Sequence, residues 1–252
     1  MFPYLELVKK EVYRFLSIWL QTLLGPLSTA LLYQLIFGHH LAEMQTGIDG
    51  VTYNTFLIPG LVIMQVLLNS FGNGSSSIIQ SKYTGNIIYI LMAPITPFVV
   101  YVAYLTASII RGVLVGVVIY CGIVWFGDNI IPKAPWVLLF FLIIGASITA
   151  GLGLIAGIIS EKFEQLAGFQ SFIMVPLIYL AGIFFNPNNF TNAWQKIVMI
   201  NPFMYIVDGF RYGCIGYSSY NLTFGVIFVL CSAIIVNIIG YSLIQSGIKL
   251  KH

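Results

Sequence analysis

Six uncharged stretches separate the few charged residues of this chain, and each is long enough to cross a lipid bilayer. They cover residues 15–42, 50–81, 83–110 together with 112–127, 134–160, 165–195 and 212–248. Only 8% of the residues are charged and 59% are hydrophobic, whereas about 25% of the residues of a soluble domain are charged. We therefore expect an all-α integral membrane protein whose residues 1–252 form a single transmembrane domain.

Six membrane-spanning helices are predicted, at residues 16–38, 55–79, 98–125, 136–159, 167–185 and 222–245. Pro94 and Pro97 interrupt the third stretch, so its helix should begin after Pro97 and leave segment 80–97 at the membrane surface. The positive-inside rule favours cytoplasmic termini, because that orientation puts seven basic residues inside and three outside. Inside lie Lys9, Lys10, Arg14, Lys82, Lys162, Lys249 and Lys251; outside lie Lys133, Lys196 and Arg211.

Two further segments are predicted to lie at the membrane surfaces. Segment 1–15 is amphipathic, so we expect a helix along the inner interface, with one face on lipid and the charged face free for a partner protein. Its apolar positions are Tyr4, Leu5, Val8, Val12, Phe15 and Leu16, and its charged ones are Glu6, Lys9, Lys10 and Arg14. Segment 186–220, with Pro187 and Pro202, is expected to form short re-entrant helices in the outer leaflet before the last span.

Three charged residues are candidates for a pathway or a gate. Arg111 is the one charge well inside a predicted span, where it should face a polar cavity, snorkel to the interface or pair with a carbonyl. It follows Pro97 by 14 residues, about 21 Å of helix, which predicts a position beyond mid-bilayer toward the outer side. Asp208 and Arg211 share a helical face near the last span, so we predict an interfacial ion pair that holds the outer loop.

Motifs of enzymes and metal sites are absent from the sequence. There is no phosphate-binding loop, no nucleophile elbow and no His-Glu-x-x-His motif, so the chain is predicted not to be an enzyme and to hold no cofactor or metal. His39 and His40 are assigned to an interfacial loop. A net charge of +3 gives no reason to expect a nucleic-acid partner. Intramembrane acids for ion coupling are also missing, so energy should come from a separate subunit.

Segment 80–97 is the candidate for receiving that energy. Ile87, Ile90 and Leu91 are predicted to line one side of a short cytoplasmic surface helix. Such a helix between two spans could receive mechanical force, and the alternative is an ordinary connecting loop resting on lipid. Glycines within the predicted spans indicate close helix packing inside one subunit rather than a dimer seam. They are Gly112 and Gly116 in the third span and Gly145, Gly151, Gly153 and Gly157 along one side of the fourth.

Four motifs resemble those of a known family. They lie at residues 14–26 (RFLSIWLQTLLGP), 56–61 (FLIPGL), 85–94 (GNIIYILMAP) and, most specifically, 201–213 (NPFMYIVDGFRYG). On these motifs, which extend over nearly the whole chain, the sequence resembles membrane subunits of bacterial ATP-binding-cassette exporters of the type-2 permease class.

The resemblance implies a homodimeric pathway above two ATP-binding subunits, which would carry ATP and magnesium. It implies that residues 82–92 form the helix that couples to the ATPase, through Lys82, Tyr83, Asn86, Ile87, Ile90 and Leu91. It also implies that residues 4–14, with Lys9, Lys10 and Arg14, form the interfacial connecting helix. Relatives often carry a glutamate at the position of Ile88 and Tyr89, so this chain departs from the family where that polar contact would lie.

The expected function is therefore the permease subunit of an ATP-driven exporter in a bacterial inner membrane, surrounded by membrane lipids. Its cargo would be a lipid, a glycolipid or polysaccharide, or an amphiphilic drug. Two alternatives come from other classes: an integral-membrane enzyme that modifies lipids, and a passive channel.

Overall fold

The computed structural model describes residues 3–38, 51–125, 130–186, 192–247 and 249, and every regular element in these ranges is a helix. Within them, five helices are long and apolar enough to cross a membrane. The first runs over Leu20–Gly38 and contains α2 (Gly25–Tyr33) between two short π-helical turns. The others are α3 (Tyr53–Tyr83), α5 (Pro97–Trp125), α6 (Pro135–Ile159) and α11 (Leu222–Ser246).

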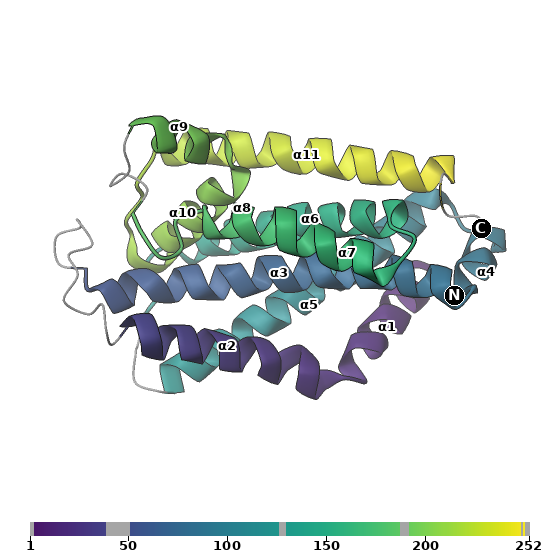
Figure 1. Cartoon of the computed structure of the whole chain (residues 1–252), viewed down its shortest axis with the longest axis horizontal. Helices are drawn as coiled ribbons and strands as arrows, with labels where there is room; N and C mark the ends of the chain where they lie inside the picture. Colours follow the sequence, from purple (N-terminus) through teal and green to yellow (C-terminus); the bar gives the residue numbers. More distant parts are fainter. Residues whose placement is uncertain (1–2, 39–50, 126–129, 187–191, 248, 250–252) are drawn as a thin grey trace.

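The long helices run side by side along the longest axis of the molecule (Figure 1). Both chain termini and α4 (Asn86–Met92) lie at one end of this bundle, which we call the terminal end. The start of α3, with α9 (Asn192–Ile200) and α10 (Pro202–Ile215), lies toward the other end, which we call the far end. The centre is formed by α3, which packs against α5, α6 and α10.

Five of the six predicted spans correspond to these five long helices, with ends that agree within a few residues. Pro97 begins α5, as expected from its fixed φ and missing N–H. The predicted fifth span, 167–185, falls instead on a helical stretch from Phe163 to Tyr179. This stretch joins α7 (Phe163–Phe169), a π-helical turn and α8 (Val175–Tyr179). It is about 26 Å long and ends six residues earlier than predicted.

Shorter helices occupy the segments that were expected at the surfaces. The N-terminal helix α1 covers Pro3–Leu16, and α4 follows α3 after Gly85, whose φ of 73° is a left-handed conformation that suits glycine. Residues 80–83 continue α3, so the surface segment begins later than predicted. Helix α10 is almost entirely buried against α3, α6 and α11, so it is part of the bundle rather than a superficial element.

Glycine allows α3 and α6 to approach main chain to main chain. A Cβ atom at Gly153 would lie 2.3 Å from the carbonyl oxygen of Phe71, and one at Gly157 would lie 2.7 Å from that of Ser75. Gly112 of α5 likewise faces α3. These contacts agree with the predicted packing inside one subunit. The expectation that all four glycines of α6 share one side is wrong, because Gly151 faces α11.

Candidate functional site

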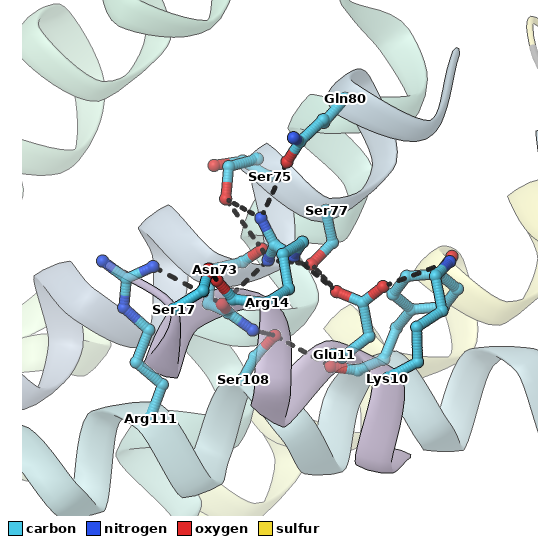
Figure 2. A network of polar contacts seen from close by, with 12 residues as sticks. Lys10, Glu11, Arg14, Ser17, Asn73, Ser75, Ser77, Gln80, Ser108 and Arg111 are labelled. Atoms are coloured by element: carbon cyan, nitrogen blue, oxygen red, sulfur yellow. Dashed lines mark hydrogen bonds and ion pairs between the residues drawn. The ribbon is translucent and has the colours of Figure 1, made fainter. Parts of the chain in front are cut away.

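A cluster of polar side chains joins α1 to α3 and α5, and we call it the arginine cluster (Figure 2). Helix α1 supplies one acid and one base that are three residues apart and share a face. Helix α3 supplies four polar side chains at spacings of three or four residues, and α5 supplies two. The members are Glu11, Arg14, Asn73, Ser76, Ser77, Gln80, Ser108 and Arg111.

Arg14 is the centre of this cluster. Its Nε donates to Oε2 of Glu11 at 2.8 Å, and one terminal nitrogen donates to Oδ1 of Asn73 at 2.9 Å and to Oγ of Ser77. The other terminal nitrogen donates to Oε1 of Gln80 at 3.2 Å and to Oγ of Ser76 at 3.3 Å. Every nitrogen of the guanidinium group therefore has a partner, which links α1 firmly to α3.

Glu11 is only 1% exposed, and its carboxylate is also fully engaged. Oε2 accepts from Arg14 and from Oγ of Ser77 at 2.6 Å, while Oε1 lies 3.6 Å from Nζ of Lys10. The prediction that the charged face of α1 is free is therefore wrong for Arg14. Its charge is stabilised inside the protein by Glu11 and by α3, whereas Lys9 and Lys10 remain exposed. Leu5, on the face expected to lie on lipid, is 57% exposed, which agrees with that expectation, whereas Phe15 of the same predicted face is buried.

Arg111 has far fewer contacts than Arg14. Among the described residues its one hydrogen bond runs from Nη1 to Oδ1 of Asn73 at 3.5 Å, and its buried Nε has no partner there. Asn73, the partner of Arg111, lies ten residues before the end of α3, about 15 Å along that helix, and the depth of Arg111 in the membrane stays a prediction. Helix α5 crosses the bundle obliquely, which a count of residues from Pro97 does not take into account (Figure 1).

Helix α4, at the terminal end, has one buried side and one exposed side. Ile87 is buried in a cluster with Ile78 and Tyr104, and Ile90, three residues later, is half-buried and packs on the same cluster, so the two share one side of α4 as predicted, and that side faces the bundle. The side chain of Leu91 lies outside what the structure describes. The opposite side carries Asn86, Ile88, Tyr89 and Met92, all exposed.

Two more of the predicted coupling residues lie at the end of α3. The side chain of Tyr83 is 83% exposed, and its ring lies edge-on to that of Phe163 on α7, with ring centroids 6.0 Å apart. Lys82 turns inward, and Nζ donates to the carbonyl oxygens of Gly157 and Ile158 at 3.3 and 2.8 Å, and to that of Ser160 at 2.7 Å. These are carbonyls at the C-terminal end of α6, where a cation is favourable.

Arg211 lies at the far end and is 1% exposed. Nε donates to the carbonyl oxygen of Phe56 at 3.2 Å, and Nη2 donates to those of Gly182 and Ile183 at 2.9 and 3.5 Å. The guanidinium carbon lies 3.7 Å from the centroid of the Phe56 ring, which is a cation–π contact. Arg211 thus joins α10 to the start of α3 and to the turn after α8.

The predicted ion pair between Asp208 and Arg211 is wrong, since no contact within 4 Å joins them in the described structure. Asp208 instead accepts from Oγ of Ser218 at 2.7 Å, from the backbone N–H of Ser219 at 2.9 Å and from that of Tyr220 at 3.4 Å. Both residues lie on buried α10 rather than at an interface, and neutral groups nearby satisfy each charge. Asp208 does hold the loop before α11, as expected of it.

The sequence reasoning missed most of the arginine cluster. Asn73, Ser77 and Gln80 were not selected, although polar residues recur at helical spacing in a stretch that is otherwise apolar. That spacing is the signal that could have found them. In the described ranges, no three His, Cys, Asp or Glu side chains gather as a metal site, and His39 and His40 lie outside those ranges.

Comparison with known proteins places these features in a family. The family model described as "ABC-2 type transporter" matches residues 4–215. The inner membrane transport permease YadH of Escherichia coli strain K12 is 33% identical over 244 residues, which cover 96% of this chain and 94% of that protein. Nodulation protein J of Rhizobium meliloti strain 1021 is 23% identical over 76% of this chain and 73% of its own, and that of Rhizobium leguminosarum bv. viciae is 24% identical over 86% and 83%.

Proposed function

Because the chain belongs to the ABC-2 type transporter family, we propose that it is the permease subunit of an ATP-driven exporter in a bacterial inner membrane. The observation that carries the proposal is α4, a short helix anchored by Ile87 that exposes large apolar side chains at the terminal end. Tyr89 is 75% exposed and Met92 is 78% exposed. Exposed apolar groups gathered on one element favour a docking surface for another protein.

The partner that we propose for α4 is an ATP-binding subunit on the cytoplasmic side. Exposed lysines at the terminal end, such as Lys9, Lys10 and Lys162, favour that side for both termini. ATP and magnesium would be bound by the partner, since this chain has no phosphate-binding loop. Tyr83 and Asn86 extend the same exposed surface.

Force on α4 would reach the membrane helices through contacts described above. Helix α4 continues directly from α3, and Lys82 connects the end of α3 to the end of α6. Arg14 connects α3 to α1, which continues into the first long helix. A displacement of α4 would therefore act on α1, α3 and α6 together.

A complete exporter would contain two copies of this chain and two ATP-binding subunits, with the cargo passing between the two permease copies. The cargo class that we propose has a hydrophobic part: a lipid, a glycolipid or polysaccharide, or an amphiphilic drug. Support comes from the arginine cluster, which places polar groups beside helices that are otherwise apolar.

Cysteine crosslinking tests the docking surface directly. Tyr89→Cys is introduced on α4, and Trp125→Cys at the far end of α5 is the matched control, since Trp125 is 87% exposed. When the chain is expressed with its ATP-binding subunit, a bifunctional thiol reagent should capture that subunit from position 89 and not from position 125. Nucleotide hydrolysis stimulated by cargo should occur in the complex only. Absence of capture from position 89, or transport by the lone chain without nucleotide, would overturn the proposal.

A further inference from the structure

The arginine cluster contains more positive than negative charge. Its one carboxylate, Glu11, is already occupied by Lys10, Arg14 and Ser77. Arg111 has no carboxylate within 4 Å among the described residues. Its hydrogen bond to Oδ1 of Asn73 is long, at 3.5 Å, and the same oxygen accepts from Arg14 at 2.9 Å. The guanidinium group of Arg111 is therefore left without a counter-ion in the part of the chain that the structure describes.

The position of Arg111 makes the missing counter-ion energetically unfavourable. It lies fourteen residues from each end of α5, a helix long and apolar enough to span the membrane. An arginine at the centre of such a helix is costly to hold in the membrane unless it has a partner or faces water. Arg111 is half-buried, and its Nε is buried without a partner. An anion from outside the chain would remove this cost.

The two arginines of the cluster lie on either side of one residue. Figure 2 shows Asn73 between the guanidinium groups of Arg14 and Arg111. One turn before Ser76, which accepts from Arg14, lies Gly72, and nothing is found within 4 Å of where its Cβ would be. Guanidinium groups bind phosphate and carboxylate through paired hydrogen bonds, and they are the preferred residues for partly buried anions. The helices around the cluster are apolar, which suits a ligand with a charged head and an apolar body.

We propose that Arg111, next to the fully bonded Arg14, binds the anionic headgroup, a phosphate or a carboxylate, of an amphiphile that enters from the membrane. The ligand can be a bilayer lipid that stays in place or the transported cargo itself. The second case deepens the proposed function and rests on it, because it identifies the cargo as an anionic amphiphile. The first case stands even without an ATP-binding partner.

Lipid binding to the lone chain tests the site. The purified protein is titrated with phosphatidylglycerol and with phosphatidylcholine of the same acyl chains, and bound lipid is counted by native mass spectrometry. We expect about a tenfold preference for the anionic lipid, which corresponds to about 1.4 kcal/mol of ion pairing. Arg111→Gln should abolish the preference and Arg111→Lys should keep most of it. Lys196→Gln, which removes an exposed charge from α9, is the matched control and should change nothing.

A thermal unfolding measurement separates ligand binding from a structural role. An arginine without an internal counter-ion gives the fold little, so Arg111→Gln should unfold at the temperature of the wild type or above when no anionic lipid is added. Added phosphatidylglycerol should raise the unfolding temperature of the wild type only. Equal binding of the two lipids by the wild type, or a marked loss of stability in Arg111→Gln without lipid, would overturn the proposal.

The two sources of the ligand are distinguished in the complex with the ATP-binding subunit. If an anionic amphiphile stimulates ATP hydrolysis in the wild type and not in Arg111→Gln, the site receives cargo. If phosphatidylglycerol binds without stimulation, the site holds a resident lipid. Both results support the anion site, and failure to find any ATP-binding partner would contradict the proposed function alone.

Discussion

Two arginines, Arg14 toward the terminal end and Arg211 toward the far end, are held in different ways. Arg14 keeps 22% of its side chain exposed and bonds mainly to other side chains, including the carboxylate of Glu11. Arg211 is fully enclosed and bonds only to main-chain carbonyl oxygens and to the face of Phe56. Groups inside the protein stabilise the charge of both arginines. The side-chain partners of Arg14 can rotate, whereas the carbonyl partners of Arg211 cannot.

The difference indicates how the two ends of the bundle should respond to force. Side chains change rotamer at little cost, so the contacts of Arg14 can exchange among Asn73, Ser76, Ser77 and Gln80 as α1 moves against α3. Carbonyl groups are fixed by the helix or turn to which they belong. We therefore expect the terminal end to rearrange during transport while the contacts of Arg211 hold the far end in place.

The largest effect is expected at Arg211. Arg211→Ala would leave the carbonyls of Phe56 and Gly182 without a donor and would open a cavity against the Phe56 ring. The free energy of unfolding should fall by about 2–4 kcal/mol. Denaturation of the detergent-solubilised protein, followed by circular dichroism, measures this change. Arg211→Lys should recover less than half, because one ammonium lacks the planar fork that reaches several carbonyls. A loss no larger than that of Glu11→Gln, which removes the carboxylate partner of Arg14, would refute the contrast between Arg211 and Arg14.

A smaller loss is expected when the acid of the arginine cluster is removed. Glu11→Gln leaves Arg14 and Lys10 without their carboxylate, which should cost about 1–3 kcal/mol, reduced by the partial exposure of Arg14. The double variant Glu11→Gln with Arg14→Gln should lose less unfolding free energy than the sum of the losses of the two single variants. A double-mutant cycle on unfolding free energy measures that coupling, and simple additivity would show that the two residues do not interact.

Asp208 tests whether the far end is held locally. Asp208→Asn places an amide where the backbone N–H groups of Ser219 and Tyr220 now donate to a carboxylate. We expect a loss of about 1–2 kcal/mol, with faster hydrogen exchange at residues 216–221. Hydrogen exchange with mass spectrometry gives both the size and the place of the effect. Faster exchange around Arg211 as well would mean that the two residues act as a unit.

The smallest effect is expected for the exposed ion pair between Glu161 and Lys249. Oε1 of Glu161 lies 3.8 Å from Nζ of Lys249, and the side chains are 53% exposed for Glu161 and 46% for Lys249. Glu161→Gln should change the free energy of unfolding by less than about 0.5 kcal/mol, because solvent and salt screen such pairs. The same denaturation measurement applies, with Lys249→Gln as the companion variant. A loss as large as that of Glu11→Gln would show that burial does not explain why the two acids contribute differently to stability.

The long helices could be predicted because each depends on a local property of the sequence. A run of apolar residues, ended by charges or by Pro97, determines a span wherever it lies in the fold. The short helix α4 was also predictable in outline, since Ile87 and Ile90 share one side of it as their spacing indicates. Residues 80–83 were assigned wrongly because no residue in that stretch stops a helix before Thr84.

The partners of the charged residues could not be predicted in the same way. Helix α1 carries both apolar and charged residues, and its sequence does not say that Glu11 and Phe15 turn inward while Leu5 stays exposed. Asp208 and Arg211 have the spacing of an ion pair, yet closer neutral partners exist for each. Main-chain carbonyls, the partners of Arg211, are present at every residue and leave no mark in a sequence.

The absence of a side chain at Gly153 has a mechanical consequence for the whole molecule. At Gly153 and Gly157 of α6 the main chain of α3 lies in direct contact, so the two helices should bend less readily as a pair than either would alone. Helix α3 is 31 residues long, about 46 Å. A force applied at Tyr83 should therefore tilt both helices together, so that the movement reaches Tyr53. It should not be absorbed by bending of α3. Gly153→Ala would add a methyl group between α3 and α6 and push the two helices apart. It should weaken the transmission of that movement without changing any charged residue.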